Sequence, residues 1–115
     1  MSKVILVAFR GEAMCFVHVL LNVLDMTEKG IEARLILEGE ATKLLPQLED
    51  KTFFLHHLWE KVRQQELVEG VCRACATKMG TVEVAEKSGL KLLADMQGHP
   101  SLGRYFKEGW QVLVF

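Results

Sequence analysis

The stretch "VILVAF", residues 4–9, decides the fold together with the glycine and the apolar segment that follow it. All six residues are apolar, and a continuous run of this length is typical of a strand that is covered on both faces. Gly11 supplies a turn, a helix is predicted over residues 12–29, and Gly30 provides its stop. A buried strand followed at once by a long helix predicts the first part of a β-α-β unit and therefore a parallel sheet.

The same alternation of strand and helix continues along the rest of the chain. Residues 31–39 alternate apolar and polar side chains, which predicts a strand nearer the sheet edge. Further strands are predicted at residues 67–71, 89–94 and 110–115, with helical segments between them. We therefore expect residues 1–115 to form a single domain with a three-layer α/β/α fold and a mostly parallel sheet of about five strands.

Composition and charge narrow the class of protein. The 115 residues are 50% hydrophobic and 25% charged, with a formal net charge of -1, as in an ordinary soluble globular protein. Lys and Arg are scattered, which argues against a nucleic-acid partner. The longest apolar stretch, "AMCFVHVLLNVL", is too short to span a membrane and contains His18 and Asn22. We expect a cytoplasmic protein that binds no membrane and whose thiols are reduced.

Chemically competent residues cluster where the predicted strands end. In open α/β sheets, ligands bind outside the carboxyl ends of the strands. The segments at that edge are residues 10–14, 38–42, 72–75 and 95–100. The candidate residues in them are Arg10, Glu12, Cys72, Cys75, Asp95 and His99. The topology predicts that any site of this protein lies at this edge.

The cysteine pair Cys72 and Cys75 is the most specific feature at that edge. Cys72 ends a predicted strand and begins a helix expected over residues 73–79, where unpaired N–H groups favour a thiolate. Arg73 adds positive charge beside it, and Cys75 lies one helical turn away. Four alternatives stay open: a sulfur-carrying nucleophile, a redox dithiol, a metal clip, or two small core residues.

Motifs for a metal or a nucleotide are incomplete. A closed zinc site needs four ligands, and beyond the pair the remaining candidates are His99, Asp95 and Cys15, which form no second C-x-x-C or His pair. The chain also lacks the glycine-rich phosphate-binding motifs. We therefore expect neither a metal nor another cofactor.

At "VCRACATKMG", residues 71–80, the sequence resembles the DsrE/DsrF-like family of small sulfur-relay proteins. In that family a cysteine ends the third strand, a short helix follows, and a glycine comes about eight residues later, as Cys72 and Gly80 do here. The resemblance extends to "KVILVAF", the long apolar helix and "GWQVLVF", so it spans nearly the whole chain. It implies a DsrE-like fold with flavodoxin- or Rossmann-like topology.

The resemblance also implies a function. Cys72 would hold sulfane sulfur as a persulfide in a sulfurtransferase-like carrier. From their positions at the sheet edge and beside Cys72, and not from the resemblance, we expect Arg10, Glu12, Arg73 and His99 to contact the substrate. The partners would be sulfur donor and acceptor proteins, or small thiols and persulfides, and the chain would form a homo-oligomer of two, three or six copies. Two alternatives remain: a dithiol redox or persulfide-reducing protein that uses Cys72 and Cys75, and a non-catalytic oligomeric binding module.

Overall fold

The computed structural model describes residues 2–115. Its strands are β1 (Lys3–Ala8), β2 (Glu32–Leu37), β3 (Val68–Cys72), β4 (Leu92–Leu93) and β5 (Gln111–Val114). Its helices are α1 (Ala13–Glu28), the 3-10 helix η1 (Gly39–Leu44), α2 (Leu45–Leu48), α3 (His56–Gln64), α4 (Arg73–Met79), α5 (Val82–Lys87) and α6 (Leu102–Lys107). Strands and helices alternate as the sequence predicts, in one α/β unit.

The five strands form one sheet in the order β4-β3-β2-β1-β5, and every neighbouring pair is parallel. The predicted fold class is therefore confirmed. The predicted position of β2 near the edge is wrong, because β2 pairs with both β1 and β3. Only the first half of this strand carries polar residues, Glu32 and Arg34, whereas residues 35–37 are fully buried like those of any central strand.

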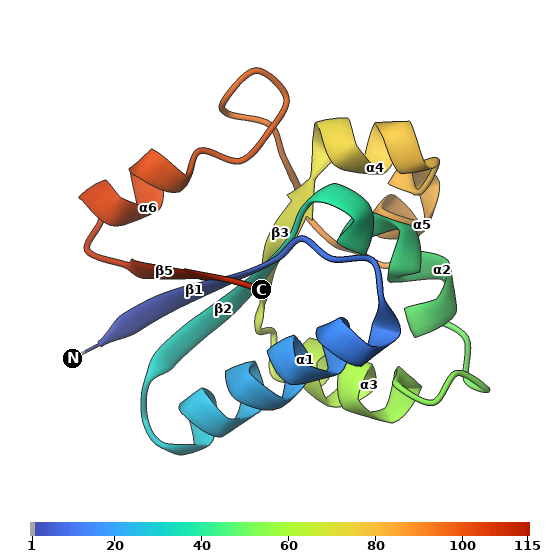
Figure 1. The fold of residues 1–115 in the computed structure, drawn as a ribbon, viewed down its shortest axis with the longest axis horizontal. Coiled ribbons are helices and arrows are strands. Elements are labelled where there is room, and N and C mark those ends of the chain that lie inside the picture. Colours follow the sequence, from blue (N-terminus) through green and yellow to red (C-terminus); the bar gives the residue numbers. More distant parts are fainter. Residues whose placement is uncertain (1) are drawn as a thin grey trace.

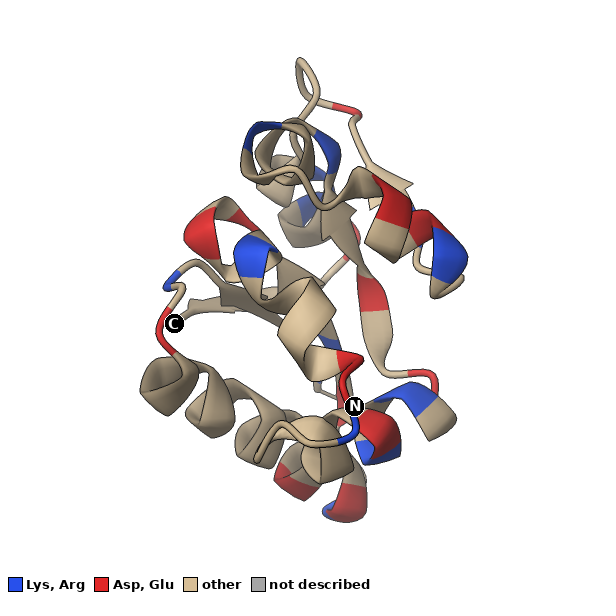
Figure 2. Ribbon diagram, turned by 90° about the vertical axis from the view of Figure 1, so that its right-hand side faces the viewer, with Lys and Arg blue, Asp and Glu red and all other residues tan. Residues whose placement is uncertain are grey.

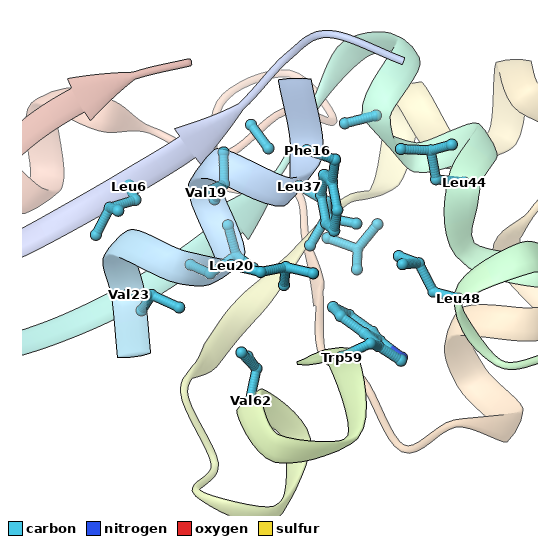
Figure 3. Close-up of a cluster of buried hydrophobic side chains, with 14 of the residues drawn as sticks. Leu6, Phe16, Val19, Leu20, Val23, Leu37, Leu44, Leu48, Trp59 and Val62 are labelled. Carbon is cyan, nitrogen blue, oxygen red and sulfur yellow. The ribbon is translucent and has the colours of Figure 1, made fainter. Parts of the chain in front are cut away.

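The larger core lies on the face of the sheet that α1 and α3 cover (Figures 1 and 3). Phe16 from α1 and Trp59 from α3 meet there with ring centroids 6.3 Å apart, and both are 1% exposed. Burial of such a side chain stabilises the fold by roughly 1.5–3 kcal/mol relative to its exposure to water. This packing fixes the layer of helices that supports the inner strands.

The opposite face of the sheet carries a smaller core beneath α6 (Figure 1). Tyr105 packs there on Ile5 and Val7 of β1, and its ring meets Trp110 edge to face. The Tyr105 hydroxyl donates a hydrogen bond to Glu69 at 2.9 Å, so the buried phenol is paired. With α6 on this face and the other helices opposite, the domain has the predicted three layers.

Along the ribbon, Lys and Arg positions are interspersed with Asp and Glu positions (Figure 2). Helix α1 carries few charges and buries Phe16, Val19, Leu20 and Val23. Met14 and Leu21 on the same helix are 71% and 48% exposed. The predicted oligomer stays a prediction.

Within residues 2–115, no helix combines the length and the apolar character that crossing a membrane requires.

Candidate functional site

The two site cysteines are placed by the junction of β3 and α4. Cys72 is the last residue of β3 and the N-cap of α4, and its Sγ accepts a hydrogen bond from the backbone N–H of Cys75 at 3.3 Å. Gly80 then ends the helix with a φ of 73°, a left-handed conformation that glycine adopts without strain. The sequence thus brings Cys72 and Cys75 onto adjacent turns of backbone, with both thiols free.

Gly70 allows β4 to pack close to β3 just before the cysteines. A Cβ atom at this position would lie 2.6 Å from Leu93 Cγ and 2.8 Å from the Lys91 carbonyl oxygen, inside van der Waals contact. The close pairing matters for the site because the loop that follows β4 carries His99.

A tight turn at residues 96–99 places His99 beside the two cysteines. The backbone N–H of Met96 donates to the His99 carbonyl at 2.8 Å, and the two central residues, Gln97 and Gly98, have φ values of 54° and 89°. Positive φ at both central positions is the requirement of a type I′ turn. The Gly98 carbonyl also accepts a hydrogen bond from the N–H of Ala74 at 2.8 Å, which docks the turn onto the first turn of α4.

The imidazole of His99 lies beside both thiols. Its Nδ1 is 3.2 Å from Cys72 Sγ and 3.8 Å from Cys75 Sγ. A thiol and an imidazole at this separation form the pair that nucleophilic cysteine chemistry requires, because the ring nitrogen takes up the thiol proton. The predicted convergence of Cys72, Cys75 and His99 is present in the structure.

Cys72 differs from its predicted state. Its side chain is 0% exposed, and burial raises the pKa of its thiol to about 12. A hydrogen bond with the Cys75 side chain raises this pKa further, while the bond from the Cys75 backbone N–H lowers it. Burial thus opposes the thiolate that the helix start favours at Cys72, because desolvation raises the pKa of this thiol more than the helix N–H group lowers it.

Glu38 is a candidate site residue that was not predicted from the sequence. It follows β2 directly, is 6% exposed, and its Oε2 has no hydrogen-bond partner among residues 2–115. Burial raises its pKa to about 7. Its position was a usable signal, since an acidic residue directly after a buried parallel strand lies at the carboxyl edge of the sheet.

Four potential ligand residues meet at this edge: Glu38, Cys72, Cys75 and His99. One donor atom from each lies within 4.8 Å of all the others. An open pocket of about 490 Å³ adjoins them, and Cys75, His99, Lys78 and Met79 are among its lining residues. Cys75 and His99 are half-buried and border this pocket, whereas Cys72 and Glu38 are buried behind them.

The structure does not bring the other predicted residues into this cluster. Arg10 lines a separate pocket with Cys15 and His18. Glu12 is exposed at the N-cap of α1 and makes no side-chain capping bond. Arg73 is exposed and does not line the pocket beside Cys75.

Asp95, another residue of the predicted edge, acts as an anchor of the His99 loop. Its carboxylate accepts hydrogen bonds from the backbone N–H of Ser101 at 2.9 Å and from Arg104 Nε at 2.8 Å. The Ser101 N–H and the Arg104 guanidinium hold the pKa of this carboxyl below its ordinary value of 3.8. The ion pair joins the loop to α6.

Asp95→Asn is expected to lower the free energy of unfolding at pH 7 by about 0.5–1 kcal/mol, because the pair is 38% and 42% exposed and solvent screens it. A carboxyl whose pKa is lower in the folded state contributes its full stability above its unfolded pKa and loses it as the pH falls through the folded value. The difference in the free energy of unfolding between Asp95→Asn and wild type should therefore be constant from pH 7 to about pH 5. It should shrink when the pH falls below 3.8, the ordinary pKa of this carboxyl. Urea unfolding at a series of pH values measures it; a difference that grows on acidification would contradict this role.

A comparison with known proteins finds a relative that matches most of this chain in sequence. No protein-family model matches it. "Uncharacterized protein MJ0733" of Methanocaldococcus jannaschii is 38% identical over 96 residues, which are 84% of this chain and 76% of that protein. An "Uncharacterized protein" of Archaeoglobus fulgidus is 46% identical over 37 residues, which are 32% of this chain and 100% of that protein.

A solved structure supports the fold independently. The "Conserved Protein of Unknown Function BT1422 from Bacteroides thetaiotaomicron" superimposes with a TM-score of 0.67 and covers 96% of this chain and 94% of its own. At 18% identity this likeness shows a shared fold alone. The match to the M. jannaschii protein is both closer in sequence and nearly as long. The chain therefore belongs to the same protein family as MJ0733 of Methanocaldococcus jannaschii.

Proposed function

We propose that the protein accepts sulfane sulfur on a cysteine of the Cys72–Cys75 pair, and that Cys75 is the acceptor. The observation that carries this proposal is the position of His99 Nδ1, within 3.2 Å and 3.8 Å of the two sulfur atoms, beside an open pocket. The sequence alone favoured Cys72 as the acceptor. Cys75 is favoured here because it lines the pocket, whereas Cys72 is buried and its thiol has a raised pKa.

The first step is a thiol exchange on sulfur. His99 takes the proton of the Cys75 thiol, and the thiolate attacks the outer sulfur of a donor persulfide, R–S–SH. The bond between the two donor sulfurs breaks, the donor leaves as a thiol, and Cys75 becomes a persulfide. No net oxidation occurs, because the sulfane sulfur only changes its partner. Lys78, which lines the same pocket, supplies a positive charge on the side from which an anionic donor approaches.

A second candidate function, persulfide reduction, is favoured by the closeness of the two thiols. Cys72 would attack the Sγ of the Cys75 persulfide, form the Cys72–Cys75 disulfide and expel sulfide. The two thiols are then oxidised by two electrons and the sulfane sulfur is reduced by two. A dithiol or a small thiol must afterwards reduce the disulfide. Both candidates use free thiols, which persist in a reducing compartment, and the proposal therefore places the protein in the cytoplasm.

Intact-mass measurement after incubation with a small-molecule persulfide tests both candidates. The metal-free wild type, kept in chelator, should gain the mass of one sulfur atom, and Cys75→Ser should gain none. Cys15→Ser is the matched control, because Cys15 is also a free, half-buried thiol but lies in another pocket, and it should react like the wild type.

Cys72→Ser separates the carrier from the reductase. If Cys72 resolves the persulfide, the wild type converts from the sulfur adduct to a form that has lost two hydrogen atoms, and Cys72→Ser stays at the adduct. If the protein is a carrier, both keep the adduct. A sulfur adduct that persists in Cys75→Ser would show that the acceptor is another residue and would contradict the proposal.

A further inference from the structure

The cluster at the carboxyl edge of the sheet contains more ligand groups than thiol chemistry uses. Glu38 from the end of β2, Cys72 and Cys75 from the β3–α4 junction, and His99 from the 96–99 turn place one donor atom each within 4.8 Å of the others. Zinc binds sulfur at about 2.3 Å and nitrogen or oxygen at about 2.0–2.2 Å, so its tetrahedral ligands lie roughly 3.3–3.8 Å apart. The four donor atoms, all within 4.8 Å of one another, therefore lie at most about 1 Å farther apart than the ligands of one zinc ion.

Glu38 is the group that thiol chemistry leaves unexplained. Its side chain belongs to a residue that is 94% buried, and its Oε2 has no hydrogen-bond donor within the described part of the chain. A carboxyl oxygen in such a place is costly unless a partner satisfies it. A Glu38 carboxyl oxygen lies within 4.8 Å of the sulfur atoms of two thiols and a nitrogen of an imidazole, and a cation between the four would give the carboxylate its missing partner.

The type of ligand selects the type of metal. Two thiolates, one imidazole and one carboxylate suit a borderline-soft divalent ion, whereas Mg²⁺ and Ca²⁺ require shells of oxygen ligands. Zn²⁺ fits this set best because it takes tetrahedral sulfur, nitrogen and oxygen ligands without redox chemistry. The ligands come from three segments, which are held by the N-cap of α4, the β2–β1 pairing and the docking of the 96–99 turn on Ala74 of α4.

We propose that Glu38, Cys72, Cys75 and His99 form a four-coordinate site for Zn²⁺ or a similar divalent ion. Metal binding releases the two thiol protons to solvent, since thiolates are the ligands. The inference goes beyond the proposed sulfur chemistry and does not depend on it. Because the ion occupies both sulfur atoms, a zinc-loaded chain cannot accept sulfur, and the two states exclude each other.

Titration of chelator-treated, metal-free protein with Co²⁺ tests the site. A tetrahedral site with two thiolates should give intense visible d–d bands and a near-ultraviolet thiolate-to-metal band that saturate at one equivalent. Added Zn²⁺ should remove both bands by displacement. No sulfur donor is present in this assay and no metal is present in the persulfide assay, so each proposal fails or stands alone.

Variants assign the ligands. Cys72→Ser should remove most of the thiolate-to-metal band. If circular dichroism shows that Cys72→Ser is unfolded, Cys75→Ser, which changes a half-buried residue, is the variant to test in its place. Glu38→Gln should weaken Zn²⁺ affinity at least about tenfold, as loss of a supporting ligand group does elsewhere. The control is the double variant Cys15→Ser/His18→Ala, which removes the other neighbouring Cys and His of the chain and should leave the spectrum unchanged.

Two results would overturn the proposal. One is a wild-type Co²⁺ complex with weak, octahedral bands and no thiolate transition. The other is a tetrahedral spectrum that Cys15→Ser/His18→Ala removes and that Cys75→Ser leaves intact.

Discussion

Zinc at a free concentration about 1,000-fold above its Kd is expected to raise the free energy of unfolding by about 4 kcal/mol. The physical reason is that the four ligands converge only in the folded chain, although Glu38 and His99 are 61 residues apart along the sequence (99 minus 38). The ion would join the end of β2, the start of α4 and the 96–99 turn, segments that the metal-free protein connects through few hydrogen bonds.

Urea unfolding in a zinc buffer and in chelator measures this gain. Cys15→Ser/His18→Ala should keep this gain. Glu38→Gln should lower it by at least about 1.4 kcal/mol, because stabilisation follows the logarithm of metal concentration over Kd and a tenfold weaker affinity corresponds to that amount. An equal zinc-dependent gain in wild type and in Cys75→Ser would place the metal elsewhere and contradict the account.

Much of the fold follows from sequence because its signals are local. Residues 4–8 of the run "VILVAF" are buried in β1, although Phe9 lies beyond the strand and is 39% exposed, and the apolar periodicity of residues 13–28 gives α1. The position of β2 was mispredicted because polar and apolar residues alternate only in the first half of the strand, at Glu32 and Arg34, whereas the second half is buried. Strand order depends on how crossovers stack the elements, and no single segment encodes that.

The candidate site was predictable in outline. Topology alone brings Cys72, Cys75 and His99 to the carboxyl edge, and the structure places them within hydrogen-bonding distance. The depth of the site was not predictable. The helix start suggested a thiolate at Cys72, but burial raises its pKa, and burial depends on packing from η1 and the 96–99 turn.

The burial of Glu38 was likewise not predictable from the sequence. A carboxylate after a strand is ordinarily solvated, and only the three-dimensional packing leaves this one buried and without a donor. The zinc ligands that the sequence suggested included Asp95, which instead pairs with Ser101 and Arg104, and Cys15, which lines another pocket.

The reactivity of the two site thiols is expected to differ by more than tenfold. Cys75 borders the open pocket, whereas Cys72 is 0% exposed and has a thiol pKa of about 12, so few Cys72 thiolates form and none faces solvent. In metal-free protein an alkylating reagent should therefore modify Cys75 well before Cys72. Zinc should protect Cys75 by occupying its sulfur, while Cys15 reacts at the same rate with and without the metal.

Time-resolved alkylation mapped by peptide mass spectrometry, in chelator and in excess zinc, tests the central claim most directly. That claim is that Glu38, Cys72, Cys75 and His99 form one site that opens to solvent at Cys75. The account predicts rapid labelling of Cys75, slow labelling of Cys72, and zinc protection confined to these two positions. Labelling of Cys72 as fast as Cys75, or a Cys75 rate that zinc leaves unchanged, would contradict it.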